Sequence, residues 1–291
     1  MTAPSKLHQY ALSMSCRSAQ GQVAAAVAFL EQQGAYIDEI AVFDDKPTSR
    51  FFLRAVFHRV ADASPDVGRM REQFLPIAQA IGATQWQVHD LQRPPRVLLM
   101  VSKFGHCLQD ILGTWRRGEL PMHPVAVVSN HPDMFQTARS HELPYHQIPV
   151  TPETRADSEA SLMKLIDAYQ ADYVVLARYM QVLSNDLCER LAGRVINIHH
   201  SFLPGFKGAK PYHQAFERGV KLIGATAHFA TPDLDEGPII DQATERVDHA
   251  HSAEDLLAVG RRMECAVLTR ALRSVLEQRV FINGQRTVVL R

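Results

Sequence analysis

The sequence predicts an α/β protein made of two domains, a small α+β domain over residues 1–92 and a mostly parallel, doubly wound domain over residues 93–291. Three observations predict this class. The chain has 291 residues, which suffices for two domains of ordinary size. The adjacent Pro94 and Pro95 break both helix and sheet. After them, runs that are apolar throughout alternate with helical segments, as in a parallel sheet covered on both faces.

The composition is that of an ordinary globular protein. Apolar residues make up 46% of the chain, enough for a buried core, and the 31 basic residues balance the 31 acidic ones. This balance argues against nucleic acid or a membrane as a partner, and no apolar run approaches the ~18 residues of a membrane span. The four cysteines lie far apart and no signal peptide is visible, so we expect reduced thiols and a cytoplasmic protein.

Residues 8–90 show the order β-α-β-β-α-β, which is the ferredoxin-like pattern. The first helix is predicted from Val23, Val27 and Leu30, which recur at helical spacing and precede Gly34. The other expected elements are strands at 8–16, 36–43, 50–60 and 84–89 and a second helix at 65–81.

This layout resembles the ACT domain, a small amino-acid-sensing module. Many ACT domains carry Asp-Arg-Pro-Gly in the first strand-to-helix loop, where the backbone approaches an amino-acid ligand. Here the loop spans residues 16–21, and only Gly21 and a displaced Arg17 match. The resemblance implies an amino-acid effector at this ACT-like domain, with a purely structural or oligomerising role as the alternative. We expect a homo-oligomer.

The second domain is predicted to place its ligand at the carboxyl ends of its strands, as doubly wound sheets do. Asn197 and His199 lie at such an end, two residues apart, so their side chains point to the same face. The expected strands are 97–101, 124–129, 146–149, 173–177 and 194–198, and the expected helices are 105–117, 132–141, 156–170 and 182–192.

Residues 195–242 carry the chemistry. Asn197 and His199 are followed by an apolar strand at 222–230 and then by Asp235 in a turn. An amide, an imidazole and a carboxylate suit chemistry at a carbonyl carbon. Each residue also has a structural interpretation, since a strand-end His is often structural, Asp235 can form an Asx turn and Asn197 can bond backbone groups.

Several motifs here resemble the folate-dependent formyltransferase family. They are Asn197-x-His199, Ser201-Phe202-Leu203-Pro204, the segment 224–229 and Leu234-Asp235-x-Gly237-Pro238. The resemblance runs from about residue 96 to about residue 280 and implies that Asn197, His199 and Asp235 are the catalytic residues. The segments 101–104, 106–108, 129–131 and 176–181, with the ACT-like domain, resemble the branch that hydrolyses 10-formyltetrahydrofolate to formate and tetrahydrofolate. In that reading, Asn197 and His199 stabilise the oxyanion and Asp235 is the general base for water.

The loop after the first strand of the second domain supports water as the acceptor. Glycinamide ribonucleotide relatives hold their acceptor's phosphate there with a Gly-, Ser- and Asn-rich loop. Phe104 and His106 are too bulky for the backbone to approach a phosphate in that way. We assign this side of the site to Ser102, Lys103, His106, Lys207 and Gly208. Transfer to an amine and a non-catalytic folate- or amino-acid-sensing module are the alternatives.

The resemblance also implies the folate pocket. The residues assigned to it are Arg178, Tyr179, Met180, Gln181, Leu183, Ala230, Thr231 and Leu234. Met180 and Leu183 can equally be ordinary core residues. We expect no metal and no cofactor, because the folate is the substrate, H-E-x-x-H is absent, and adjacent His199 and His200 point apart.

Overall fold

The computed structural model describes residues 7–59, 66–205 and 211–291, which divide into two compact units. The first unit contains the chain up to Pro94 together with Glu277–Phe281 and Val288–Arg291; the second contains Pro95–Leu276 and Ile282–Thr287. The sequence had assigned all of 93–291 to one domain. The C-terminal segments depart from this because Nε of Arg54 donates to the Glu277 carbonyl at 2.9 Å, and Phe281 packs with Phe52 and Leu290.

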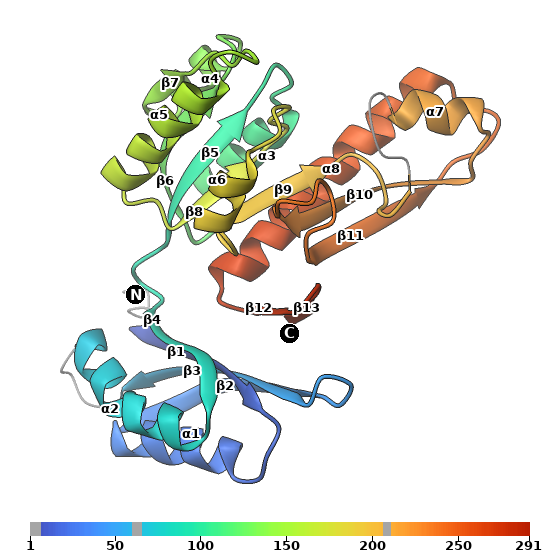
Figure 1. The fold of residues 1–291 in the computed structure, drawn as a ribbon. Coiled ribbons are helices and arrows are strands. Elements are labelled where there is room, and N and C mark those ends of the chain that lie inside the picture. The colour runs from blue at the N-terminus through green and yellow to red at the C-terminus, as the bar shows by residue number, and fades with distance from the viewer. Residues whose placement is uncertain (1–6, 60–65, 206–210) are drawn as a thin grey trace, which may run out of the picture. The chain divides into compact units, whose positions relative to one another are not determined.

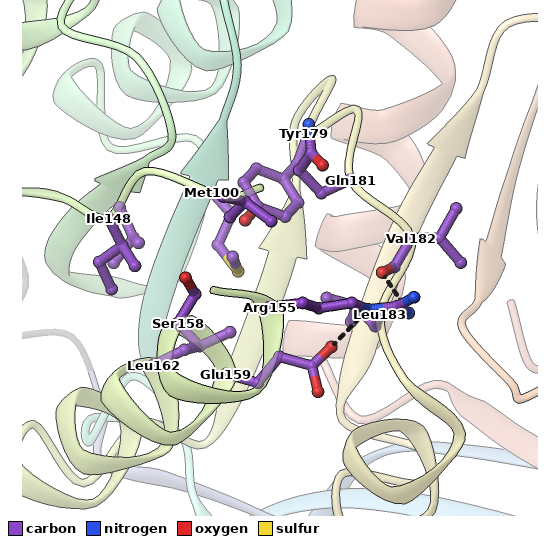
Figure 2. A pocket seen from close by; sticks show the side chains of 12 residues that line it. Met100, Ile148, Arg155, Ser158, Glu159, Leu162, Tyr179, Gln181, Val182 and Leu183 are labelled. Atoms are coloured by element: carbon purple, nitrogen blue, oxygen red, sulfur yellow. Dashed lines mark hydrogen bonds and ion pairs between the residues drawn. The ribbon is translucent and has the colours of Figure 1, made fainter. Parts of the chain in front are cut away.

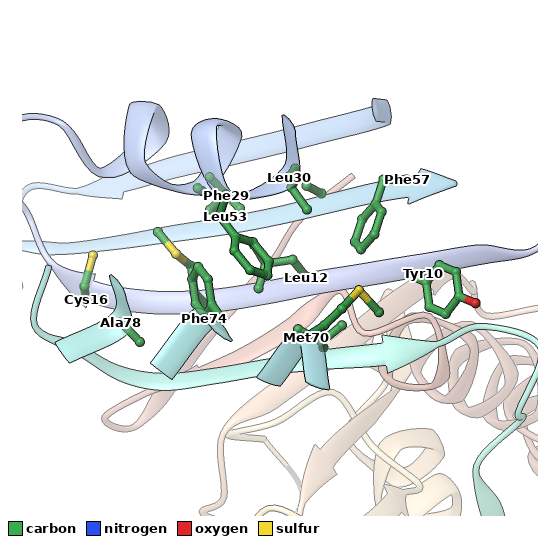
Figure 3. Packing of buried hydrophobic residues seen from close by; sticks show 14 of the residues in the cluster. Tyr10, Leu12, Cys16, Phe29, Leu30, Leu53, Phe57, Met70, Phe74 and Ala78 are labelled. Carbon is green, nitrogen blue, oxygen red and sulfur yellow. The ribbon is translucent and has the colours of Figure 1, made fainter. Parts of the chain in front are cut away.

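The first unit is an antiparallel sheet with two helices. Its elements are β1 (Gln9–Arg17), α1 (Gln22–Gln32), β2 (Ala35–Asp45), β3 (Arg50–Arg59), α2 (Val67–Ala80) and β4 (Ala83–Asp90). The strands lie in the order β2-β3-β1-β4, so the predicted ferredoxin-like arrangement is confirmed. Figure 3 shows its core, in which Phe29 and Phe74 from the two helices meet Leu12 and Leu53 from the sheet.

Helix α1 buries a different face from the predicted one. Val23 is 39% exposed, and the buried stripe is Gln22, Ala26, Phe29 and Leu30. The side-chain amide of Gln22 donates to the Arg17 carbonyl, so a polar residue that is satisfied locally begins the buried stripe. Because Gln22 is polar, hydrophobic spacing alone placed Val23 on the buried face in its stead.

The second unit contains the predicted doubly wound sheet, extended by two antiparallel strands. Its strand order is β11-β10-β9-β8-β5-β6-β7 (Figure 1). Strands β7, β6, β5, β8 and β9 are parallel, β10 is antiparallel to β9, and β11 is antiparallel to β10. The strands are β5 (Arg96–Val101), β6 (His123–Ser129), β7 (Tyr145–Gln147), β8 (Tyr173–Leu176), β9 (Val195–His199), β10 (Leu222–Phe229) and β11 (Ile239–Arg246). The helices are α3 (His106–Arg116), α4 (Phe135–Ser140), α5 (Arg155–Ala168), α6 (Asn185–Arg190), α7 (Pro211–Glu217) and α8 (Ala253–Leu276).

Helices cover both faces of this sheet. Leu162 of α5 and Leu187 of α6 pack in one cluster with Leu98 and Met100 of β5. Because strand side chains alternate, the buried Leu99 belongs to the opposite face. Helices α3 and α8 contact each other, and α8 also contacts β9, β10 and β11. The sequence analysis did not predict α8, although it is the longest helix of the described residues.

A short hairpin of β12 (Val280–Asn283) and β13 (Arg286–Val289) follows α8. Among the described residues, no helix is long and apolar enough to cross a membrane.

Candidate active site

A cavity of about 300 Å³ opens at the carboxyl ends of β8 and β9. The three residues predicted to be catalytic line it together with every residue predicted to contact folate. These are Asn197, His199, Asp235, Arg178, Tyr179, Met180, Gln181, Leu183, Ala230, Thr231 and Leu234. The cavity thus brings together side chains from two segments that are distant in sequence, the 178–184 turn after β8 and the 230–238 loop after β10. That these residues bind folate stays a prediction.

Asp235 and His199 form the central pair. Nδ1 of His199, which is 4% exposed, lies 3.1 Å from Oδ2 of Asp235. Asp235 has a φ of 59°, a left-handed conformation that turns its carboxylate back toward the strand ends. Burial alone would raise the pKa of Asp235, but the hydrogen bond from His199 and the nearby imidazole of His228 outweigh it and hold the pKa well below its usual value. Asp235 is therefore ionised, and His199 donates to it through Nδ1.

His228 orients Asn197, a role the sequence analysis did not foresee. Nδ1 of His228 lies 2.9 Å from the Phe229 carbonyl, which can only accept, so Nδ1 carries the proton. In the neutral ring Nε2 is then an acceptor, and it lies 3.2 Å from Nδ2 of Asn197. The same Nε2 is 3.7 Å from Asp235, too far for a hydrogen bond. Asn197 thus gives one N–H to His228 and keeps the other.

The second ring nitrogen of His199 has no hydrogen-bond partner among the described residues. Nε2 of His199 is buried and unpaired, while Nδ1 is held by Asp235. A buried polar atom without a partner is costly in a folded protein and suggests a bound ligand or a functional role. The site therefore offers an imidazole nitrogen that can exchange a proton, beside an amide that can donate a hydrogen bond.

The segment after His199 is fixed by Thr226 on β10. Oγ1 of this fully buried residue donates to the Ser201 carbonyl at 2.9 Å and accepts from the Leu203 backbone N–H at 3.0 Å. The Gln242 side-chain amide donates to the same oxygen at 2.9 Å. The Ser-Phe-Leu-Pro motif thus leaves β9 in a defined direction, which keeps the end of the strand in place.

The 178–184 turn is held from two sides. Ser102, at the end of β5, accepts from the Met180 backbone N–H at 3.0 Å and donates to Asn130 at 2.7 Å. On the side of α5, Nη2 of Arg155 donates to the Val182 carbonyl at 2.8 Å, as Figure 2 shows. Glu159 accepts from the backbone N–H of Ser184 at 2.7 Å. A wall fixed in this way is preorganised for a ligand.

The mouth of the cavity is apolar. Met180, Val182 and Leu234 line it and are each more than half exposed. Tyr179 lies on the inner side of the turn, where burial and the carboxylate of Glu159 raise its pKa to about 12. Exposed apolar side chains gathered around a cavity indicate a site for a ligand with an aromatic or apolar surface.

The family of the chain follows from its similarity to known proteins. The profile of the formyl transferase family matches residues 95–272. The chain is 47% identical to a formyltetrahydrofolate deformylase of Corynebacterium over 97% of its own length and 98% of the relative's. It also superimposes with a TM-score of 0.93 on the crystal structure of the formyltetrahydrofolate deformylase from Burkholderia mallei, with 55% identity, covering 98% of this chain and 100% of that one. The chain belongs to the formyltetrahydrofolate deformylase family.

Formyltetrahydrofolate deformylases share their catalytic fold with transferases. A glycinamide ribonucleotide transformylase from Symbiobacterium toebii is 33% identical and has a TM-score of 0.64. The structural match covers 95% of the transformylase chain but only 69% of this one. About a third of this chain therefore has no counterpart in that transferase.

In this deformylase-family chain, the predicted acceptor residues lie outside the cavity lining. Ser102 is buried and supports the 178–184 turn, Lys103 is exposed, and Nε2 of His106 lies 2.8 Å from Glu264 of α8. Lys207 and Gly208 lie outside the described residues. None of the three described residues lines this cavity, and their assignment to the acceptor side stays a prediction.

One cluster has residue types that bind metals. His106, Cys107 and Glu264 offer ligand atoms within 4.8 Å of one another. Both carboxylate oxygens of Glu264 already accept hydrogen bonds, from His106 and Tyr212, and the Arg178 guanidinium lies 3.3 Å away. A hydrogen bond with Cys265, together with burial, raises the pKa of Cys107, whereas metals bind the thiolate. The cluster does not fit a metal ion.

Proposed function

We propose that this protein hydrolyses 10-formyltetrahydrofolate to formate and tetrahydrofolate. Relatives named formyltetrahydrofolate deformylase match it over nearly its whole length. The observation that carries the proposal is the cavity in which Asn197, His199 and Asp235 meet beneath an apolar rim. An apolar rim suits the flat pterin of the folate, and the three polar groups suit attack on the formyl carbon that N10 carries.

In the proposed mechanism, His199 and Asp235 act as one unit. Nε2 of His199 takes a proton from water, and the resulting hydroxide bonds to the formyl carbon. Asp235, ionised and hydrogen-bonded to Nδ1, stabilises the imidazolium. The free N–H of Asn197 donates to the developing oxyanion, which is worth about 3 kcal/mol for a well-placed donor.

Collapse of the tetrahedral intermediate completes the reaction. The bond between the formyl carbon and N10 breaks, and the imidazolium of His199 returns its proton to N10. The products are formate, after loss of the acid proton to solvent, and tetrahydrofolate. Proton transfer of this kind typically contributes about 10²–10⁴-fold to the rate.

These roles revise the expectation from sequence, which made Asp235 the general base and His199 an oxyanion donor. A carboxylate whose pKa is held well below its usual value is a weak base. Its hydrogen bond with Nδ1 of His199 instead fixes the ring so that Nε2 is the nitrogen free to react.

Incubation with 10-formyltetrahydrofolate alone tests the function. We expect formate and tetrahydrofolate in equal amounts, without any added amine. Formate is measured with a coupled dehydrogenase and tetrahydrofolate by absorbance. Turnover that requires an amine would favour formyl transfer instead, and folate binding without turnover would favour a sensing module.

We further propose that catalysis needs no metal and no other cofactor. The protein is treated with EDTA, desalted, and assayed beside an untreated sample. We expect the same kcat and KM in both, because the only metal-type cluster found among the described residues is already saturated by hydrogen bonds and a guanidinium. Loss of activity that zinc or iron restores would contradict this.

We also propose a cytoplasmic homo-oligomer. The edge strand β2 exposes Tyr36, Ile40, Val42 and Phe43, which favours pairing with a second copy. An amino-acid effector of the first unit stays a prediction. The loop where it would bind is closed by its own contacts, from Gln22 to the Arg17 carbonyl and from Ser18 to Asp44, which favours an assembly role.

A further inference from the structure

Glu264 is a buried carboxylate to which the mechanism assigns no role. It lies on α8 and is 1% exposed. Oε1 accepts from the Tyr212 hydroxyl at 2.7 Å, Oε2 accepts from Nε2 of His106 at 2.8 Å, and Nε of Arg178 is 3.3 Å from Oε2. We call these four residues the Glu264 network. Burying a charge is costly unless it is paired, so an arrangement of this kind needs a reason.

The carboxylate is ionised. Burial alone would raise the pKa of Glu264, but the hydrogen bond from His106 and the positive charge of Arg178 outweigh it and lower the pKa. Burial and the adjacent charge of Glu264 raise the pKa of Tyr212, so the hydroxyl stays a donor. Glu264 therefore acts as a negative charge that holds three separate segments, the start of α3, the 178–184 turn and α7.

Arg178 connects this charge to the cavity. It lines the cavity and is the second residue after β8, with a left-handed φ of 65°. Its carbonyl accepts from the Ser102 backbone N–H at 3.1 Å. Nε and Nη1 of its guanidinium are buried and make no hydrogen bond within the described residues. The ion pair with Glu264 is thus the contact that compensates its charge and sets the direction of its side chain.

We propose that Glu264 is a positioning residue for folate binding, acting through Arg178 to hold the start of the 178–184 turn. The inference rests on the proposed function. Without the carboxylate, Arg178 would carry an uncompensated buried charge and would turn toward the cavity or solvent. The turn would shift with it, since the Arg178 side chain and carbonyl are fixed at neighbouring points. Tyr179–Leu183 form the wall that would move.

Gly260 shows how closely the network is packed. A Cβ at Gly260 would lie 2.1 Å from Cζ and 2.4 Å from the hydroxyl of Tyr212. The absence of a side chain at Gly260 thus leaves room for the Tyr212 ring. This allows the Tyr212 hydroxyl to reach Glu264, which lies one turn further along α8. A helix interior normally disfavours glycine. This one is explained by the contact with Tyr212.

The test compares Glu264→Gln, Arg178→Met and the double variant in steady-state hydrolysis of 10-formyltetrahydrofolate. We expect Glu264→Gln to raise KM about tenfold and to change kcat by less than about threefold, because the folate wall moves while the catalytic residues stay in place. If Glu264 acts through Arg178, the double variant should match Arg178→Met in KM within about twofold.

The controls separate positioning from a loss of folding. Glu254→Gln, at an exposed site on the same helix, should keep wild-type kinetics. Gly260→Ala leaves Glu264 intact but pushes Tyr212 away from it, and we expect a smaller increase in KM with no loss of helix content. Wild-type KM for Glu264→Gln, or effects that multiply in the double variant, would overturn the inference.

The same comparison works without turnover. Tetrahydrofolate binding, followed by fluorescence titration, should weaken about tenfold in Glu264→Gln. If the wild-type protein binds folate but does not hydrolyse its formyl derivative, the proposed function fails while this inference is still tested. If Glu264→Gln and Arg178→Met both bind tetrahydrofolate as the wild type does, the inference fails even where hydrolysis is observed.

Discussion

Asp235→Asn is expected to lower kcat by about 10²–10⁴-fold while KM changes little. The substitution preserves size but removes the charge that stabilises the His199 imidazolium. The Asn side chain can also donate its amide to Nδ1, which would favour the wrong tautomer and leave Nε2 protonated. The measurement is the initial rate of tetrahydrofolate formation under saturating substrate. Asp233→Asn, exposed in the same loop and absent from the cavity lining, is the matched control.

His199→Ala should cause a loss of similar size, and combining it with Asp235→Asn should add little. Residues that act as one unit show this lack of additivity, because removing either partner removes the function of both. Retention of more than about a tenth of the wild-type kcat by Asp235→Asn would refute the paired role. If the losses of kcat in the two single variants instead multiply in the double variant, Asp235 acts on water independently of His199.

Much of the fold was predictable because local patterns and global topology agree. The apolar runs at β5, β6 and β8 are buried on both faces, which is the condition under which uniform hydrophobicity predicts a parallel strand. The first unit was equally clear in its order of elements. Helix α1 shows the limit of the method, since locally bonded Gln22 replaces an apolar residue at the head of the buried face.

The site was predictable where it depends on neighbours in sequence. Asn197 and His199 are two residues apart on one strand, so their common orientation follows from strand geometry. His228 could not be assigned a role without the antiparallel register of β9 and β10, which places it opposite Asn197. Glu264 was hidden for a similar reason. Its helix spacing among Val259, Gly260 and Val267 places it on the buried face, but only the tertiary fold supplies Arg178 and Tyr212 as partners.

Gly237→Ala is expected to abolish measurable hydrolysis. A Cβ at this buried position would lie 1.7 Å from the Phe229 carbonyl oxygen and 2.9 Å from its carbon, both of them backbone atoms. The backbone N–H of Phe229 donates to the Pro238 carbonyl at 3.0 Å, so the two segments cannot separate without breaking this link. Overpacking of this kind typically costs about 1–3 kcal/mol and forces the backbone to shift. The shift would fall on the 230–238 loop, which carries Asp235.

The kinetic pattern should distinguish this variant from Asp235→Asn. Moving the loop displaces Ala230, Thr231 and Leu234 as well as Asp235, so folate binding should weaken together with the chemical step. Tetrahydrofolate titration and thermal unfolding would report the two effects separately. Gly113→Ala is the control, because a Cβ there meets only Nη1 of Arg117, at 3.6 Å, inside α3. That control should gain about 0.5–1 kcal/mol of stability from helix propensity and keep its activity. Normal folate binding by Gly237→Ala would mean that the loop can relax around the new methyl group, so that the close approach to Phe229 is not what positions Asp235.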